Sequence, residues 1–138
     1  MKNIHLLSIA LLSVATVAAG ADEPFNGTKP MVCEPQKGHD CLPTESTCKP
    51  LKAEKGKDLN LHIDVQNMKL KSPFRTAELP IQSFSYNAKS LVLQGTASEQ
   101  VWSATVHRTT GRLTVVIADR EGAYVVFGQC KLEGGAAQ

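Results

Sequence analysis

The sequence predicts an all-β protein, in which a small antiparallel meander of about six strands forms a barrel or half-barrel behind a Cys/Pro-rich irregular segment. Two observations support this fold class. From Leu59 onward, apolar and polar side chains alternate with a period of two, which is typical of strands with one buried face. Four short turn segments then divide the pattern so that apolar residues face each other across neighbouring strands.

The first 21 residues have the features of a signal peptide. Lys2 supplies a positive start, residues 6–19 form an uncharged apolar run, and Ala19-Gly20-Ala21 fits the small-x-small cleavage pattern. We predict cleavage before Asp22, with a cut after Ala19 as the alternative. A retained membrane anchor is the competing interpretation, but the apolar run is shorter than the roughly 20 residues that span a bilayer. The sequence therefore predicts an exported protein, located in the periplasm or outside the cell, with no membrane span in the mature chain.

The mature chain divides into a lead-in segment (22–58), a β domain (59–132) and a flexible C-terminal tail (133–138). The lead-in holds three of the four cysteines and five of the seven prolines, so we expect no regular element in it beyond a turn or two. The formal charge of +2, or +1 without Lys2, argues against nucleic acid as a partner. One local concentration of charge, Lys49, Lys52, Lys55 and Lys57, is interpreted as a solvated linker, with contact to an anionic surface as the alternative.

Four cysteines in an oxidising compartment predict two disulfides, formed by Cys33, Cys41, Cys48 and Cys130. We favour Cys48–Cys130 with Cys33–Cys41. Closing a loop of roughly 80 residues constrains the unfolded chain most, by about 4 kcal/mol. Loop entropy leaves the pairing of Cys33 with Cys130 and of Cys41 with Cys48 open.

The β domain begins with an uninterrupted alternation from Leu59 to Gln66. The alternation slips at Asn67, where we expect a bulge or a bend. Pro73 and Pro80 bound a connection. Five further strands are predicted at 81–86, 90–95, 100–109, 112–118 and 123–131.

Hairpin geometry tests whether these strands form one meander, because residues opposite each other must share a face. Turns are expected at Ala88-Lys89, Ala97-Ser98, Thr110-Gly111 and Asp119–Gly122. These turns predict four pairs of partners: Tyr86 with Leu91, Leu93 with Trp102, Val106 with Val115, and Ile117 with Tyr124. The predicted core face comprises Phe84, Tyr86, Leu91, Leu93, Trp102, Ala104, Val106, Leu113, Val115, Ile117, Tyr124 and Val126.

The last two strands also carry apolar residues on the opposite face, at Val116, Val125 and Phe127. A solvated face would carry polar residues there, so we expect something to cover them. One candidate is the lead-in, folded back over the sheet and held by a disulfide to Cys130. The other is a partner protein or a ligand.

Residues with the chemistry of a metal or catalytic site are few. Cys33, His39, Cys41 and Cys48 could surround zinc, but their spacing is not that of a zinc knuckle and disulfides are favoured. His62, Asp64 and His107 are a second candidate metal or catalytic site, and all three can also be exposed residues of a solvated sheet face. The chain lacks the C-x-x-C, G-x-S-x-G, P-loop and H-E-x-x-H motifs, and no cofactor is predicted.

Residues 103–130, with Thr110-Gly111-Arg112-Leu113 and the closing Gly128-Gln129-Cys130, resemble the C-terminal half of many small exported bacterial proteins without an assigned activity. The chain is also similar in outline to the periplasmic lysozyme inhibitors, which are small disulfide-bearing β-barrels. It lacks their Ser- and Gly-rich inhibitory loop, so no functional residue is transferred. The sequence therefore favours a noncatalytic binding module for an envelope protein, a glycan or a small apolar ligand. The alternative is a metal-binding protein or enzyme that uses His62, Asp64 and His107.

Overall fold

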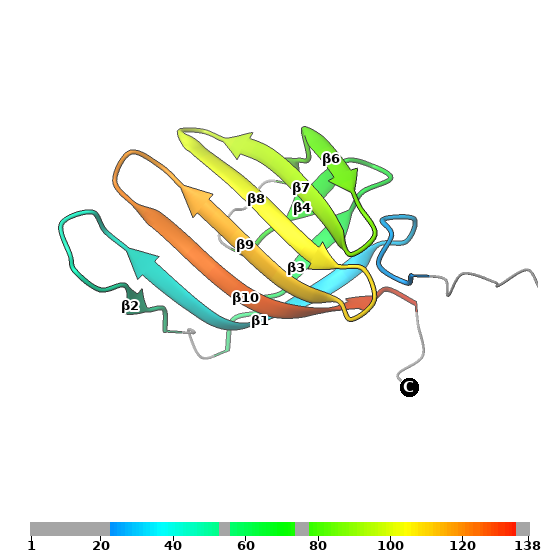
Figure 1. Cartoon of the computed structure of the whole chain (residues 1–138), viewed down its shortest axis with the longest axis horizontal. Helices are drawn as coiled ribbons and strands as arrows, with labels where there is room; N and C mark the ends of the chain where they lie inside the picture. The colour runs from blue at the N-terminus through cyan, green and yellow to red at the C-terminus, as the bar shows by residue number, and fades with distance from the viewer. Residues whose placement is uncertain (1–22, 53–55, 74–77, 135–138) are drawn as a thin grey trace, which may run out of the picture.

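The computed structural model describes residues 23–52, 56–73 and 78–134. The predicted signal peptide and the end of the predicted tail lie outside these residues. Within them the fold is all-β, with one antiparallel sheet curled into a half-barrel (Figure 1). The fold class predicted from the sequence is therefore confirmed. None of the described segments forms a helix with the length and apolar character needed to span a bilayer.

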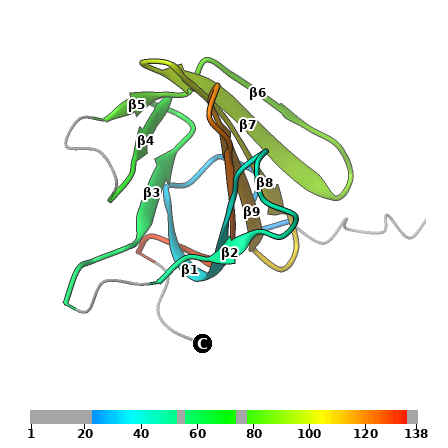
Figure 2. The same ribbon diagram turned by 90° about the vertical axis from the view of Figure 1, so that its left-hand side faces the viewer.

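The described strands are β1 (Met31–Cys41), β2 (Lys49–Pro50), β3 (Leu61–Asp64), β4 (Lys69–Lys71), β5 (Leu79–Pro80), β6 (Ser83–Tyr86), β7 (Ser90–Ala97), β8 (Gln100–His107), β9 (Arg112–Ala118) and β10 (Ala123–Leu132). Nine of them follow the order β5-β4-β3-β1-β10-β9-β8-β7-β6, and β2 pairs with β1 beside this path. Figure 2 shows how the curl brings β3–β5 opposite β7–β9 across the interior. At one end the two walls meet, because Gly95 of β7 lies against the backbone oxygen of Pro80.

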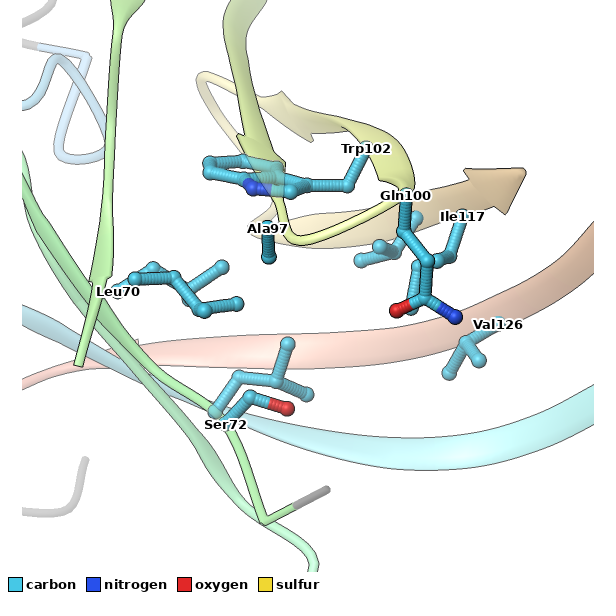
Figure 3. A pocket seen from close by; sticks show the side chains of 10 residues that line it. Leu70, Ser72, Ala97, Gln100, Trp102, Ile117 and Val126 are labelled. Atoms are coloured by element: carbon cyan, nitrogen blue, oxygen red, sulfur yellow. The ribbon is translucent and has the colours of Figure 1, made fainter. Parts of the chain in front are cut away.

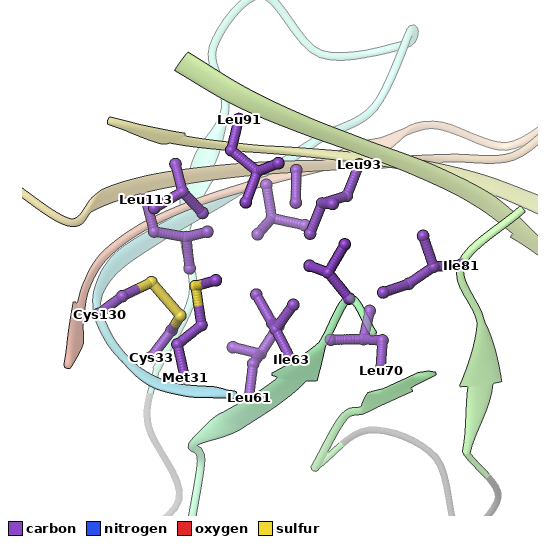
Figure 4. Close-up of a cluster of buried hydrophobic side chains, with 14 of the residues drawn as sticks. Met31, Cys33, Leu61, Ile63, Leu70, Ile81, Leu91, Leu93, Leu113 and Cys130 are labelled. Carbon is purple, nitrogen blue, oxygen red and sulfur yellow. A yellow bond between two sulfur atoms is a disulfide. The ribbon is translucent and has the colours of Figure 1, made fainter. Parts of the chain in front are cut away.

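The core fills the concave side of the sheet, where inward side chains from both walls meet (Figure 4). The largest fully buried side chains are those of Met31, Cys33, Ile63, Leu91, Leu93, Val106 and Cys130. Of the predicted core face, Leu91, Leu93, Trp102, Ala104, Val106, Leu113, Val115 and Val126 are buried, and Ile117 is partly buried against them. The period-two pattern therefore identified the inward face of β7–β10 correctly.

The expectation of an irregular lead-in is wrong. Its centre forms β1, which runs antiparallel to both β10 and β3 and makes the sheet continuous across the expected boundary between 58 and 59. Met31 and Cys33 supply the buried positions of this strand. The register shifts between Pro35 and Lys37, so Pro35 sits at an irregularity of the ladder, where a proline is tolerated within a sheet. This shift and the polar residues around it hide the strand's alternation in the sequence.

The disulfides are Cys33–Cys130 and Cys41–Cys48, which is the pairing that loop entropy left open and not the one we favoured. Cys33 and Cys130 are direct partners across β1 and β10. Cys41 and Cys48 close the short connection between β1 and β2. Two disulfides are consistent with an exported protein.

Two of the four predicted pairings have the observed register, Tyr86 with Leu91 and Ile117 with Tyr124. The other two are displaced by two residues. Trp102 lies opposite Gly95, because the β7–β8 turn is Ser98-Glu99, with Ser98 at a φ of 56°. A displacement of two residues keeps every side chain on its face, so the face assignment survives the error in register.

The second displaced pairing is between β8 and β9, where Val106 lies opposite Leu113 instead of Val115. The connection is a four-residue loop in which the Gly111 N–H donates to the His107 carbonyl at 2.8 Å, and Gly111 has a φ of 72°. The slip expected at Asn67 is likewise a hairpin turn. It joins β3 to β4, and the Asp64 carboxylate accepts hydrogen bonds from the Asn67 backbone and side chain.

Phe84 and Tyr86 are wrongly assigned to the core, since 46% and 63% of their surfaces are exposed. They share a face with their buried partners Leu93 and Leu91, but β6 is an edge strand that pairs only with β7. The Tyr86 ring instead contacts the Arg108 guanidinium, 5.1 Å from its centre. Tyr124, also assigned to the core, is only half-buried.

Candidate functional site

A mostly apolar pocket of about 50 Å³, partly open to solvent, lies inside the half-barrel, between the ends of β7–β10 and the strands β3–β5 (Figure 3). Its apolar lining comprises Leu61, Leu70, Leu79, Ala97, Trp102, Val115, Ile117 and Val126. One buried water needs about 10–15 Å³ of such space, and an engineered cavity of about 150 Å³ accepts benzene. The pocket therefore has room for more than one water but not for an aromatic ring.

Trp102 is placed in this pocket by the glycine opposite it. Gly95 has no side chain, so the indole of Trp102 lies across the backbone of β7. A Cβ atom at Gly95 would be 2.6 Å from Cζ2 of Trp102. The pairing of a glycine with an aromatic residue therefore sets the position of the ring.

The indole N–H of Trp102 has no hydrogen-bond partner in the protein, although Trp102 is only 5% exposed. Two other buried side-chain atoms in the described residues share this property, Asp40 Oδ1 and Arg108 Nε, but neither residue lines the pocket. Leaving a buried donor unpaired costs about 1–3 kcal/mol. A residue that lines the interior pocket thus carries one buried, unpaired donor.

Ser72 and Gln100 are the two polar side chains in the pocket lining. The Gln100 amide nitrogen donates to Asp119 Oδ2 at 3.2 Å, and Figure 3 shows the amide oxygen turned toward the pocket. Asp119 also accepts the backbone N–H groups of Glu121 and Gly122. These three bonds hold the pKa of Asp119 below its ordinary value, so the carboxylate stays charged and fixes Gln100.

A second, wider groove of about 200 Å³ adjoins the pocket, and Val126 lines both. Lys37, Lys52 and Lys57 line this groove together with apolar residues of the β1–β3 region. Two of these lysines belong to the charged run noted in the sequence. Lys49 of the same run pairs with Glu45, and Lys55 lies outside the described residues.

Comparison with known protein families, with curated protein sequences and with solved structures finds no match to this chain. The resemblance to the periplasmic lysozyme inhibitors therefore remains an expectation from the sequence. The site has to be interpreted from its own geometry.

The predicted partner surface lies on the convex face of the sheet. Val116 and Val125 are neighbours across β9 and β10, and Phe127 follows on β10. Val116 is 39% exposed and Phe127 42% exposed, whereas Val125 is half-buried. The lead-in does not fold over them as expected, because β1 extends the sheet beside β10. A partner at this face stays a prediction.

The predicted metal residues are divided between two places. His62 and Asp64 line one surface pocket, where His62 Nδ1 lies 3.1 Å from Glu133 Oε1. His107 lines another, and its Nδ1 faces the backbone N–H groups of Thr109 and Thr110. In the described ranges, no three His, Cys, Asp or Glu side chains gather as metal ligands would.

The interior pocket is the feature that sequence reasoning missed. Trp102 was assigned to the core, but a pattern of apolar residues does not reveal where the packing stays incomplete. The pairing of a lone tryptophan with a strand glycine is the available signal. The predicted register between β7 and β8 differs from the observed one by two residues, and this error concealed the pairing of Trp102 with Gly95.

Proposed function

We propose that the protein is an exported, periplasmic binding protein without catalytic activity, which holds a small apolar ligand in the interior pocket. The observation that carries the proposal is the unpartnered indole N–H of Trp102, a residue that lines a mostly apolar pocket. Ligand pockets in proteins commonly combine an apolar lining with a few placed polar groups. The signal segment and the two disulfides support export.

The volume of the pocket limits the size of the ligand group that it can hold. Its volume is about 50 Å³, well below the space that a benzene ring occupies in a protein cavity. A short alkyl group fits this space. An acceptor atom on the ligand, such as a hydroxyl or carbonyl oxygen, would take the hydrogen bond that Trp102 offers.

Trp102 is the sole tryptophan of the chain, so its fluorescence reports directly on the pocket. We expect primary alcohols from butanol to octanol to change this fluorescence in a saturable manner. Each methylene buried is worth about 0.8 kcal/mol, so affinity should rise about four-fold per carbon until the pocket is full. The same ligands should raise the melting temperature, because they bind only the folded state.

A matched pair of variants tests where the alcohols bind. Ala97 lines the pocket, so Ala97→Leu should fill it and abolish saturable binding. Ala118→Leu adds the same volume at the end of β9, outside the pocket lining, and should bind as the wild type does. Circular dichroism establishes that both variants fold. Absence of saturable binding to the wild type, or equal binding by Ala97→Leu, overturns the proposal.

A further inference from the structure

We propose that two copies of this protein associate through the outer edge of β6, which pairs antiparallel with the β6 of the second copy about a two-fold axis at Ser85. β6 is one end of the strand order and pairs only with β7 among the described strands (Figure 2). All four of its residues are exposed. A free strand edge is a template for pairing with another chain.

The backbone groups that point away from β7 are those of Phe84 and Tyr86. The Asn87 N–H donates to the Ser90 carbonyl at 3.0 Å, so these two residues form a hydrogen-bonded pair. Hydrogen-bonded and non-hydrogen-bonded pairs alternate along an antiparallel ladder. The Ser85 backbone therefore faces β7, whereas the N–H and carbonyl groups of Phe84 and Tyr86 face outward. In the described part of the chain, no second strand lies beside β6 to pair with them.

The side chains of Phe84 and Tyr86 are exposed and lie on one face, because they are two residues apart on a strand. The Tyr86 ring contacts the Arg108 guanidinium. Arg108 in turn pairs with Glu23 at 2.7 Å and donates to the Asn87 carbonyl at 2.6 Å. The ring therefore rests on a side chain that is itself fixed, so less freedom is lost when a partner covers it.

These groups are arranged symmetrically about Ser85. When Ser85 lies opposite its own copy in an antiparallel pair, Phe84 of each copy lies opposite Tyr86 of the other. The outward backbone groups of Phe84 and Tyr86 then exchange hydrogen bonds. Residues directly opposite each other share a face, so each Phe84 ring also lies beside a Tyr86 ring, which is a stabilising cross-strand pair. One two-fold operation thus satisfies the backbone and the rings together.

The absence of charge favours a second copy as the occupant of this edge. Residues 81–88 contain no charged side chain and no proline, the residues with which edge strands commonly avoid association. The opposite end of the strand order does carry them. β5 contains Pro80, and Glu78, just before β5, pairs with Lys69 of β4 at 3.0 Å. The β6 edge offers no charge for an unlike partner to match and does not repel its own copy.

The interface is small, because each copy contributes one short strand. Interfaces that bury less than about 1,200 Å² are typical of weak complexes, so we expect a dissociation constant on the order of 100 µM. At about 5 µM, a concentration suited to denaturation experiments, the protein is then monomeric. Sedimentation equilibrium from about 5 µM to about 1 mM should show a reversible shift from monomer to dimer.

Two charge variants at the axis test the register. Ser85→Lys places like charges opposite each other, where the Cα atoms of such a pair are about 4.5 Å apart. Ser85→Asp does the same with negative charges. Each variant should weaken self-association at least about five-fold. An equimolar mixture of the two should form a heterodimer at least as tightly as the wild type forms its dimer, and added salt should weaken the heterodimer.

Ser83→Lys is the matched control, because Ser83 is also exposed on β6 but lies opposite Asn87 of the second copy in this register. Its two lysines are about 13 Å apart along the strands, beyond the screening length of about 8 Å, so it should dimerise as the wild type does. Circular dichroism establishes that the variants fold. A wild type that stays monomeric up to about 1 mM overturns the proposal. Undiminished dimers of Ser85→Lys, or a mixture that does not associate, also overturn it, because the copies would then meet through another surface.

Discussion

Cys33 of β1 and Cys130 of β10 lie directly opposite each other, and their disulfide crosses the middle of the sheet inside the core. Both are almost completely buried. The second disulfide, Cys41–Cys48, lies toward the exposed connection to β2. The two bonds span 97 and 7 residues of sequence. They therefore constrain the unfolded chain to very different extents.

Replacing Cys33 and Cys130 together by Ala should lower the free energy of unfolding by about 4 kcal/mol or more, from lost loop closure and lost packing. Replacing Cys41 and Cys48 together should cost about 2 kcal/mol less than that. Urea denaturation of the two double variants gives the comparison. Equal losses would contradict the assignment of the long-range bond as the dominant constraint.

Gly95→Ala should destabilise the protein by about 1–3 kcal/mol, the usual cost of overpacking. The added Cβ would lie 2.6 Å from both Trp102 Cζ2 and the Pro80 carbonyl oxygen. The backbone oxygen cannot rotate away, so the indole or the β5–β7 contact has to move. Trp102 fluorescence should shift even without ligand. Thr96→Ala, at an exposed neighbouring position, is the control, and a Gly95→Ala protein as stable as the wild type would refute the close packing.

Leu93 and Phe84 are register partners on one face, yet Leu93 is fully enclosed and Phe84 is 46% exposed. Leu93→Ala should lower the free energy of unfolding by about 2–5 kcal/mol. Phe84→Ala should cost less, about 1 kcal/mol, since nearly half of the Phe84 surface stays in water in the folded protein. Chemical denaturation measures both. A cost at Phe84 similar to that at Leu93 would mean that β6 is covered in solution.

This pair shows what the sequence could predict. Alternation of side chains determines which residues share a face, and that assignment is correct along β7–β10. It contains no information about what lies opposite that face. Phe84 and Tyr86 were therefore assigned to the core although their strand is an edge, and the same limit hid the incomplete packing around Trp102.

The strand β1 in the lead-in could not be predicted from the sequence for a different reason. β1 combines a proline, a register shift and many polar residues, so its local pattern resembles a loop. Its strand conformation depends on partners far away in sequence, β10 on one side and β3 on the other. The disulfide pairing depends on that same arrangement. Loop entropy ranks the possible pairings by their effect on the unfolded chain, whereas Cys33 and Cys130 pair because the folded sheet places them together.

The hydrogen bonds to Asp119 predict an acid-sensitive contribution to stability. The N–H of Glu121, the Gln100 amide and the N–H of Gly122 lower the pKa of Asp119 in the folded protein. The unfolded chain lacks these bonds, so its Asp119 binds a proton at higher pH. The contribution is therefore fully present above about pH 4 and is lost as the pH falls through the lower folded pKa.

Asp119→Asn should reduce the loss of stability between about pH 7 and about pH 3 relative to the wild type. Urea midpoints at the two pH values measure it. Glu121→Gln removes a charge from the same turn but leaves the backbone donors in place, so it should behave as the wild type does. An unchanged acid loss in Asp119→Asn would mean that other carboxylates are responsible.

The pairing of β1 with β10 also has a consequence for the order of folding. A ribosome releases the chain from its N-terminus, and β10 follows all the other described strands in the sequence. β1 is the first long strand to be synthesised, but it cannot pair with β10 until β10 has been synthesised as well. Pairings between segments so far apart in the sequence form slowly. Until Cys130 emerges, Cys33 has no native partner. The half-barrel thus cannot be completed before its last described strand, β10, is available to pair.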